Sequence, residues 1–592
     1  MGCGSSAMVR REAEPTGVQR AAPEQRTLPA DSTPKEPAPI DQAGVDVMKQ
    51  EIADLKEQLE SEQFDHAKFR KDCMAHVEEL EKDIARLQAQ LRCKSEFKNE
   101  ERAPPISVMA DSYKAGHFLM YPECKSMSAY GEFREPFRGM QTGGQQDNRF
   151  VFYGMRHYIE NFVARKWTKM DIDAADAFYK THAVAGRPYP FPRDLFTAFV
   201  EENEGYFPVV IEALPEGTVA YTHTPVFIIS AEDKYSRLCT FLETLLTMVW
   251  YPSCVATLSR YSRDCIEEGF NKSVDDDSRF LLESRLHDFG FRGCTSVEQS
   301  ILGGSAHLLN FEGSDTMSAC YHCQFYLNGG RPVASSIPAT EHSVMTAWPT
   351  EEEAIMNEIE HFGDGLFAAV MDSYDYDSAL ENVLPRIAPA AKAKGGVMVI
   401  RPDSGDPVEQ VIKGLKAAEK CFGAVTNGKG FKVVQGAAVI QGDGINYNTI
   451  QKIQEAVLSE GFSAQNVAYG MGGGLLQKLN RDTMSFATKL SHITFASGES
   501  RDVMKTPKSS SAKTSLPGKL FVGRAGPGAP PMVYPQGDPA CKGLEPVMKV
   551  VYNKRPVPGV FEDFSAVRAR VNREWAALVM RVEMHVLLVG AE

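Results

Sequence analysis

Charged side chains in this sequence stand directly after short apolar runs, at the points where buried strands would end. The clearest run is 397–400, which is followed by a turn that contains Arg401 and Asp403. Asp406 and Pro407 come next, an order typical of a capped helix N-terminus with proline at its first position. Folds built from parallel strands keep their chemistry at the carboxyl ends of the strands. We therefore expect Arg401 and Asp403 to belong to a functional site.

The same order of strand, polar or glycine-rich loop and helix recurs nearby. The other runs are 367–370 before Asp372, 437–440 before Gly442 and Asp443, and 466–469 before the glycines at 470 and 472–474. Such repeated units predict a parallel α/β barrel or a doubly wound sheet, with the loops on one face. Carboxylates there could bind hydroxyls or Mg²⁺, and N–H groups at a glycine-rich helix start could bind phosphate. This face therefore suits a sugar phosphate.

Further candidate groups lie before these units. Phe289 lies in an expected strand-to-loop transition at 286–293 and could stack on a planar ring, although a core phenylalanine is the plainer interpretation. The run 308–311 predicts another strand that ends in a carboxylate. His342 follows a further expected strand end, and Asp372 on the next loop could orient its imidazole.

The composition is that of an ordinary soluble protein, with 43% hydrophobic and 24% charged residues in a chain of 592. This length allows two or three domains. No apolar run approaches the roughly 20 residues that cross a bilayer. A net charge of −14 disfavours nucleic acid as a partner, so an anionic substrate needs locally placed positive charge.

Lysines between 503 and 519 could supply that charge. Lys505 and Lys513 lie in this stretch, which contains no acidic residue and is rich in Ser, Thr and Pro. We expect a mobile basic loop here, and a solvated surface loop without a role in binding is the alternative.

The twelve cysteines are scattered and no export signal precedes them, so reduced thiols in the cytoplasm are expected. Cys320 and Cys323 form one CxxC pair, but no second pair follows at the spacing of a zinc site. Ordinary packing is the favoured interpretation of this pair, with a redox or metal role as the alternative.

The first six residues fit an acylation signal, because Gly2 follows the initiator Met and Ser6 stands at the expected position. Cys3 could carry a second acyl chain, and two chains anchor a protein stably whereas one binds only marginally. We expect residues 1–46 to form a disordered, acylated tail that holds the protein at a membrane surface. A chance match is the alternative.

Apolar residues spaced alternately by three and four predict a coiled coil of about six heptads over 47–94. Two features weaken the packing in the middle of this coiled coil. The apolar spacings around Cys73 are four and four, and the seam positions 62 and 66 hold Glu62 and His66. A parallel dimer is the simplest arrangement, pairing with a partner helix is another, and a solitary solvated helix is the alternative. Nothing in this segment is catalytic.

Motifs along the rest of the chain together resemble the nicotinamide phosphoribosyltransferase family. In order they are DSYKAGH (111–117), HDFGFRG (287–293), NFEGSDT (310–316), SIPATEHS (336–343), DSYD (372–375), IRPDSGDP (400–407), VIQGDG (439–444) and GMGGGLLQKLNRD (470–482). Each motif alone is weak, but their shared order over about 105–580 is specific.

The resemblance implies an α/β fold: an irregular α/β barrel of the type II phosphoribosyltransferases over 251–489, beside an α+β domain. The α+β domain would take residues 105–250 and be completed by about 490–592. The resemblance also implies a homodimer with two active sites at the subunit interface.

The resemblance further implies roles for individual residues. Nicotinamide would lie between Phe289 and Tyr113 of the partner subunit, and Asp315 would accept a hydrogen bond from its carboxamide. Arg292 and Arg401 would contact the pyrophosphate and base region. The ribose would be held by Asp403, Gly442 and Asp443. The 5′-phosphate would be bound by Gly473 together with Arg481 and Lys489 of the partner subunit. ATP would phosphorylate His342, which Asp372 holds, and Lys505 and Lys513 would contact nucleotide phosphates.

In the implied reaction, the ring nitrogen of nicotinamide attacks C1 of phosphoribosyl pyrophosphate, and pyrophosphate leaves through an oxocarbenium-like transition state. Mg²⁺, for which no direct side-chain ligand is predicted, and arginine would stabilise the leaving charge. Phosphorylated His342 would add negative charge near the ribose and couple ATP hydrolysis to substrate affinity.

Two positions depart from the family pattern. Ala368 stands where the family commonly has a serine that touches the carboxamide, and Ala438 replaces a basic residue often found before VIQGDG. Loss of one neutral hydrogen bond costs about 0.5–1.5 kcal/mol, so affinity could fall without a change of reaction.

The nearest alternative function is that of a nicotinate phosphoribosyltransferase, which shares the architecture. Asp315 favours the amide, because a carboxylate repels the carboxylate of nicotinate but accepts readily from an amide N–H. A non-catalytic scaffold on a membrane-tethered coiled coil is a different class of function. It is disfavoured because His342, Arg401 and Asp403 are all present.

Overall fold

The computed structural model describes residues 42–60, 74–77, 80–81, 84, 104–142, 145–182, 187–508 and 513–578. The chain divides into two compact units, Met1–Leu91 and Arg92–Glu592, which are taken separately below. The predicted acylation positions Gly2 and Cys3 lie outside the described residues. No helix in the described part of the chain is both long and apolar enough to span a membrane.

In the first unit, the helix α1 (Gln42–Glu60) packs against helical residues between 74 and 84. The apolar seam is shared, since Ile52 lies in one buried cluster with Val77, Leu80 and Ile84. Lys56 pairs with Glu81 at 2.6 Å and His76 with Glu51 at 3.7 Å. Both pairs join residues 25 positions apart, so the two segments run in the same direction.

This pairing bears on the coiled coil predicted over 47–94. In one straight helix, residues 25 positions apart would be separated by roughly 37 Å. The described residues of α1 and of 74–84 therefore pack side by side, and the apolar seam that they share lies within one chain. Pairing between two chains stays a prediction.

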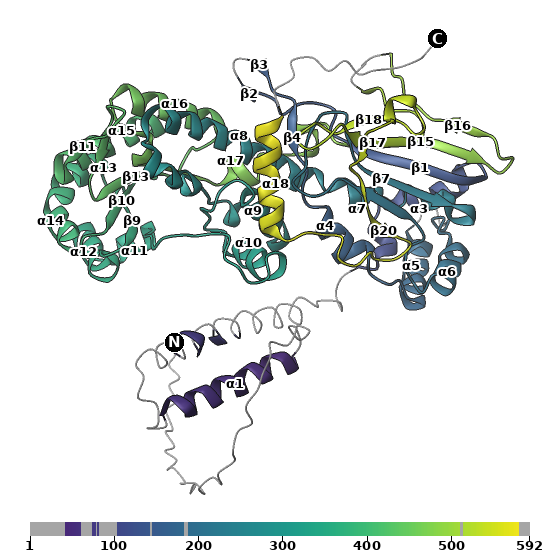
Figure 1. The fold of residues 1–592 in the computed structure, drawn as a ribbon, viewed down its shortest axis with the longest axis horizontal. Helices are drawn as coiled ribbons and strands as arrows, with labels where there is room; N and C mark the ends of the chain where they lie inside the picture. The colour runs from purple at the N-terminus through teal and green to yellow at the C-terminus, as the bar shows by residue number, and fades with distance from the viewer. Residues whose placement is uncertain are drawn as a thin grey trace, which may run out of the picture. The chain divides into compact units, whose positions relative to one another are not determined.

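The second unit contains a six-stranded antiparallel sheet in the order β16-β15-β1-β7-β5-β20. Its strands are β1 (Cys124–Glu132), β5 (Val210–Ala213), β7 (Pro225–Glu232), β15 (Ala487–Phe495), β16 (Ser500–Asp502) and β20 (Lys549–Asn553). The sheet thus joins strands from both ends of this unit, which Figure 1 shows as blue and yellow-green arrows side by side.

Smaller elements surround this sheet. A three-stranded sheet is formed by β17 (Leu520–Arg524), β18 (Met532–Pro535) and β19 (Glu545–Pro546), and short pairs by β2 (Gln141–Thr142) with β3 (Gln145–Gln146) and β4 (Arg149–Val151) with β6 (Val219–Tyr221). The helices are α3 (Ser112–Met120), α4 (Met155–Tyr158), α5 (Lys169–Thr181), α6 (Arg193–Glu202), α7 (Glu243–Thr247) and α18 (Phe564–Ala577).

The other half of this unit is built on a parallel sheet in the order β8-β14-β13-β10-β9. The strands are β8 (Leu286–Asp288), β9 (Leu366–Val370), β10 (Val397–Arg401), β13 (Ala437–Gln441) and β14 (Val467–Met471), and all of their pairs are parallel. The four strands predicted from strand-loop-helix units are therefore confirmed.

Isolated parallel bridges continue the sheet from β8 round to β9. Asp288 pairs with Ser314, Gly313 with Ser335, and Ala339 with Ala368. Irregular segments thus take the place of regular strands in closing the ring, which is the irregular barrel that the sequence predicted. The predicted strand 308–311 is wrong, because Leu308 ends helix α9 (Val297–His307) and the chain continues as a turn.

Helices cover the barrel. They are α10 (Met317–His322), α11 (His342–Ala347), α12 (Glu351–Phe362), α13 (Tyr376–Ser378), α14 (Leu384–Lys394), α15 (Pro407–Phe422), α16 (Tyr447–Ser459) and α17 (Gly473–Leu476), and a small hairpin of β11 (Ala424–Thr426) and β12 (Lys432–Val434) is added. The predicted start of α15 is confirmed, since the Asp406 carboxylate accepts from the N–H groups of Val408 and Glu409, with Pro407 at the first helical position.

The barrel interior is lined by apolar side chains, one from each of the strands β9, β10, β13 and β14. Ala368, Val399, Ile440 and Ala468 form this buried cluster, with Phe289 packed against it. Alternate residues of the same strands point outward to the helices, as the two-residue period of a strand requires. The short side chains of Ala368 and Ala468 occupy little of this interior.

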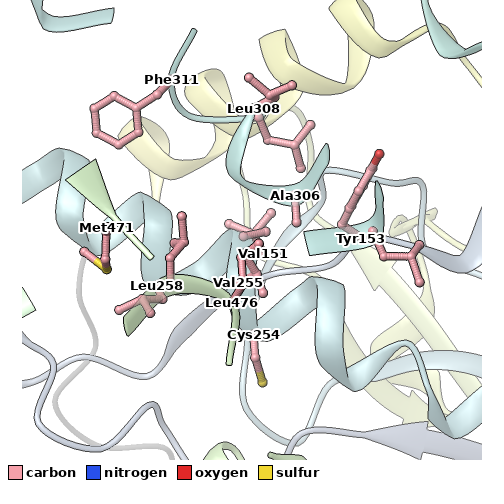
Figure 2. Close-up of a cluster of buried hydrophobic side chains, with 14 of the residues drawn as sticks. Val151, Tyr153, Cys254, Val255, Leu258, Ala306, Leu308, Phe311, Met471 and Leu476 are labelled. Carbon is pink, nitrogen blue, oxygen red and sulfur yellow. The ribbon is translucent and has the colours of Figure 1, made fainter. Parts of the chain in front are cut away.

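Helix α8 (Trp250–Ser273) joins the two halves of this unit and is buried along most of its length. Cys254, Val255 and Leu258 on this helix lie in one apolar cluster with Val151 of β4 and Leu476 of α17 (Figure 2). This shared core connects the segment that follows the barrel strand β14 with the antiparallel half of the unit.

Candidate active site

The predicted site residues fall into two groups in the structure. The first group lies at the barrel, where Phe289, Arg292, Asp315 and Arg401 line one cavity of about 340 Å³. Residues that are far apart in the sequence therefore meet around a space that can hold a small ring.

The ring of Phe289 is held in place by glycines. The Phe289 N–H donates to the carbonyl of Met471 at 3.1 Å, which continues the β8–β14 pairing. A Cβ atom at Gly470 would lie 2.0 Å from the ring, and one at Gly442 would lie 3.1 Å from it. The guanidinium of Arg401 stands 5.6 Å from the ring centroid. Phe289 is thus an ordered aromatic wall with a cation at its face.

Asp315 lines this cavity, with a hydroxyl and an imidazole beside one of its oxygens. The hydroxyl of Ser336 donates to Oδ1 of Asp315 at 2.7 Å, and Nδ1 of His287 lies 3.6 Å from the same atom. Burial raises the pKa of Asp315, but these two neighbours outweigh it and hold the pKa below its ordinary value. The group is therefore an ionised hydrogen-bond acceptor.

His342, at the start of α11, lies between two carboxylates. Its Nε2 is 3.1 Å from Oδ1 of Asp372, and its Nδ1 is 3.9 Å from Oδ2 of Asp403. The other Asp372 oxygen accepts from the Asp403 N–H at 2.9 Å and from the Ser404 hydroxyl at 2.5 Å. Burial raises the pKa of Asp372, but these donors and His342 lower it by more, so that the pKa lies below its ordinary value. An ionised Asp372 thus fixes the imidazole, whose side chain stays 46% exposed.

Arg401 connects this histidine cluster to the ring cavity. It pairs with Asp403 at 3.2 Å and donates to the carbonyl of Thr340 at 3.4 Å. Gly442 lies close by, since a Cβ there would come within 3.6 Å of the Arg401 side chain. Asp443, which follows, is exposed at the end of β13. The carboxylates and the guanidinium of the predicted loops therefore share one face, as expected.

The glycine-rich loop before α17 packs beside Phe289. A Cβ at Gly472 would stand 3.3 Å from the carbonyl oxygen of Phe289, and one at Gly474 would stand 2.6 Å from that of Ile445. Gly473 between them begins the short helix α17. Gly474 has no room for a side chain, and the loop therefore packs closely beside Phe289.

The second group of predicted residues lies on the antiparallel half. Tyr113 in α3 is 50% exposed, and its hydroxyl donates to Asp111 at 3.2 Å. Burial and Asp111 raise the pKa of Tyr113, while the nearby charge of Arg481 lowers it. The pKa of Lys489 is lowered by burial and by Arg134.

Lys505 belongs to the same neighbourhood, because its charge also lowers the pKa of Lys489. Lys513 is exposed further along the basic stretch. Among the described residues, no hydrogen bond or ion pair joins this second group to the residues at the barrel. Figure 1 shows α3 and β15 at one end of this unit and the barrel strands at the other.

The CxxC pair is packed in the protein. Cys323 is buried, Cys320 is half-buried, and both thiols are free. Burial raises the pKa of each. In the described part of the chain, no group of three or more His, Cys, Asp or Glu side chains is arranged to hold a metal ion. These findings favour the packing interpretation of the pair.

Sequence reasoning did not assign the donors that hold Asp315 and Asp372. Ser336 and His287 lie within motifs that were noticed, and Ser404 follows Asp403 directly. The sequence offered no other signal for them than their places in or beside these motifs. Their contacts join segments that are distant in the sequence.

Comparison with known proteins identifies the family. The model of the N-terminal domain of nicotinamide phosphoribosyltransferase matches residues 105–211, and the nicotinate phosphoribosyltransferase family model matches residues 284–542. A nicotinamide phosphoribosyltransferase of Xanthomonas campestris is 39% identical over 422 residues, 70% of this chain and 86% of the relative. The chain belongs to the nicotinamide phosphoribosyltransferase family.

More distant relatives agree with this family. Nicotinamide phosphoribosyltransferases of Mycoplasma pneumoniae and Acinetobacter baylyi are 30% and 28% identical, over 70% and 72% of this chain and 94% and 89% of their own.

Solved structures support the fold alone. Human nicotinic acid phosphoribosyltransferase is similar with a TM-score of 0.54 at 18% identity, over 80% of this chain and 95% of that one. Nicotinate-nucleotide pyrophosphorylase of Pyrococcus furiosus reaches 0.50 at 14% identity, over 80% and 96%. The type II phosphoribosyltransferase fold expected from the family motifs is confirmed.

Proposed function

We propose that this chain condenses nicotinamide with phosphoribosyl pyrophosphate to give nicotinamide mononucleotide and pyrophosphate. The observation that carries the proposal is the ionised Asp315 beside the ring of Phe289, held by Ser336 and His287. A carboxylate in this state accepts a hydrogen bond from the NH₂ group of nicotinamide. It repels the carboxylate of nicotinate, so the geometry favours the amide.

The charges around the ring cavity suit the reaction. The ring nitrogen of nicotinamide forms a bond to C1 of the ribose as the C1–O bond to pyrophosphate breaks. Arg401 and Arg292 stabilise the negative charge of the departing pyrophosphate. Asp403 and Asp443 bind ribose hydroxyls and favour the developing positive charge of the sugar, with Gly442 allowing close approach.

Mg²⁺ is the metal that such a reaction uses, and it neutralises the charge of the pyrophosphate when bound. Magnesium usually keeps several waters and takes one or two carboxylates together with substrate phosphates. The exposed carboxylate of Asp443 and the partly exposed one of Asp403 fit this role.

His342 is proposed as the site of phosphorylation by ATP. Asp372 fixes Nε2 of the imidazole and leaves the half-exposed ring open to a nucleotide. A ring nitrogen forms a bond to the γ-phosphorus, and the bond from that phosphorus to ADP breaks. The new negative charge lies near Asp403 and Arg401, and thus couples ATP to the binding of the sugar phosphate.

The second group of residues is proposed to complete the active site of a partner subunit in a homodimer. Tyr113 is half exposed and would cover the other face of the nicotinamide ring from Phe289. Arg481 and Lys489 would bind the 5′-phosphate together with the N–H groups near Gly473. Lys505 and Lys513 would bind nucleotide phosphates. The separation of the two groups within one chain supports this arrangement.

The amino-terminal region is proposed to be an anchor outside the catalytic part. Acylation at Gly2 and Cys3 would hold the otherwise cytoplasmic protein at a membrane surface. A second copy or a partner helix would pair with the seam of α1 in place of the residues of 74–84 that pack on it here. Deletion of residues 1–100 should leave turnover nearly unchanged and release the protein into the soluble fraction. Retention on membranes after this deletion would rule out the anchor.

A product assay tests the catalytic proposal. Purified protein with Mg²⁺ and phosphoribosyl pyrophosphate is offered nicotinamide or nicotinate, each with and without ATP. We expect nicotinamide to be used far better than nicotinate, with a lower KM when ATP is present. Asp315→Ala should reduce kcat/KM for the amide more than for the acid. A preference for nicotinate in the unchanged protein would refute the assignment.

A further inference from the structure

A second cavity lies between the six-stranded sheet and β17, and none of the residues proposed for catalysis lines it. Its volume is about 260 Å³, and its walls come from β1, β5, β7, β15, β17 and the chain near β20. It is therefore a separate space on the antiparallel half of the protein.

Strand register explains why this space exists. Ser128 stands opposite Ser230 on one side and His492 on the other, and Ser126 stands opposite Glu232. Residues directly opposite in antiparallel strands point to the same face of the sheet. Larger side chains normally interdigitate where two sheets pack. Small serines on this face leave a hollow under β17 instead.

Three hydroxyls and one carboxylate of the hollow have no partner among the described residues. In the described part of the chain, the hydroxyls of Ser126, Ser128 and Ser230 make no hydrogen bond. Glu212 also lines the cavity, and its carboxylate has neither an ion pair nor a hydrogen bond to any described residue. Burial raises the pKa of Glu212 above its ordinary value. A cation beside this carboxylate would remove that penalty.

We propose that this cavity binds a small organic cation, with its charged group at Glu212 and its apolar body against Ile228, Phe521 and Met548. The serine hydroxyls accept hydrogen bonds from N–H groups of the ligand. Glu232, at the rim, is already paired with Lys554 at 3.6 Å, so Glu212 is the carboxylate available to the ligand.

The position of the cavity connects it to the basic stretch 503–519. His492 in its wall pairs with Asp502 at 2.8 Å, directly before that stretch, and Lys519 at the end of the stretch lines the cavity. The Leu516 N–H donates to the hydroxyl of Tyr130 at 2.6 Å, beside the same sheet face. A bound ligand thus contacts the segments on both sides of the lysines. An effect of this ligand on the binding of phosphate substrates rests on the proposed function. The binding of the cation to the cavity does not.

The binding test compares 2-phenylethylammonium with its neutral analogue 2-phenylethanol on the full chain by calorimetry. We expect the cation to bind at least tenfold more tightly than the alcohol, both to the unchanged protein and to Asp315→Ala. Glu212→Gln should weaken the cation at least tenfold and leave the alcohol unchanged. Ser230→Leu, which fills the hollow, should abolish binding of both.

Failure of the cation to bind the unchanged protein, or equal affinity for Glu212→Gln, would overturn the site. Glu212→Gln is nearly isosteric and decides the matter even where Ser230→Leu does not fold. Loss of binding in Asp315→Ala would place the cation in the catalytic cavity instead. For the linked effect, the cation should shift the KM for phosphoribosyl pyrophosphate at least twofold in the unchanged protein and not in Glu212→Gln. Proven binding with an unchanged KM would overturn the regulatory part alone.

Discussion

The hydroxyl of Ser336 donates a hydrogen bond to Oδ1 of Asp315 at 2.7 Å. The two residues come from the irregular segments that close the barrel, so their meeting depends on that closure. With His287 3.6 Å from the same oxygen, the carboxylate keeps one orientation and its ionised form. Recognition of a neutral amide depends on this geometry.

Ser336→Ala should raise the KM for nicotinamide by roughly two- to tenfold with little change in kcat. The loss of one hydrogen bond, about 0.5–1.5 kcal/mol, sets this range. Steady-state kinetics measures it, with Ser459→Ala on the exposed end of α16 as the matched control. An unchanged KM would show that Ser336 does not orient Asp315.

Gly470→Ala should reduce kcat/KM at least tenfold, because the new Cβ would lie 2.0 Å from the ring of Phe289 and displace it. Gly365→Ala is the control, since its nearest neighbour would be 3.8 Å away. Both variants are compared by kinetics and by circular dichroism. Full activity in a folded Gly470→Ala protein would argue against a role for the Phe289 ring.

Asp288→Asn should stabilise the protein at pH 8 but not at pH 4. Burial raises the pKa of Asp288 to about 6. A carboxyl whose folded pKa is raised favours folding below its unfolded pKa of about 4 and loses this contribution as pH rises through about 6. Asparagine keeps the acceptor for the Gly290 N–H, which lies 2.7 Å from Oδ1 of Asp288, and cannot ionise.

Thermal unfolding across this pH range measures the difference for Asp288→Asn. The gain at pH 8 should be up to about 3 kcal/mol, from two pKa units. The exposed Asp364→Asn serves as the control and should show no such dependence. A gain that is the same at both pH values would contradict the proposed ionisation.

Mixing two inactive variants should restore activity if the active site is shared between subunits. Asp403→Ala removes a residue of the barrel group and Lys489→Ala one of the second group. A mixed dimer has one intact site, so random re-pairing should restore about a quarter of full activity. The pair Asp403→Ala with Asp443→Ala should restore none, because both changes fall in the same group. Equal results for both mixtures would contradict a shared site.

Ala368→Ser should lower the KM for nicotinamide by roughly two- to tenfold. Ala368 is buried in the barrel interior, in the apolar cluster against which Phe289 packs. A hydroxyl there can donate to the carboxamide and adds about 0.5–1.5 kcal/mol. Ala438→Ser on the neighbouring strand is the control. A higher KM would show that the apolar wall is needed at position 368.

Sequence alone predicted the parallel strands, because each is a short apolar run between a turn and a helix cap. Asp406 and Pro407 predicted the start of α15 for the same reason, since capping depends on residues within one turn. The carboxylates after β9, β10 and β13 followed directly from these strands. The family motifs then predicted the fold and the site residues.

Tertiary structure alone decided the features that depend on contacts between distant segments. The closure through Ser314, Ser335 and Ala339 has no period of its own, so 308–311 looked like a strand although it follows the end of α9. The seam of α1 has the same spacing whether it packs within one chain or between two. The hydrogen bond from Ser336 to Asp315 depends on the closure of the barrel. The hollow depends on the pairing of β1 with β7, which places its serines opposite one another.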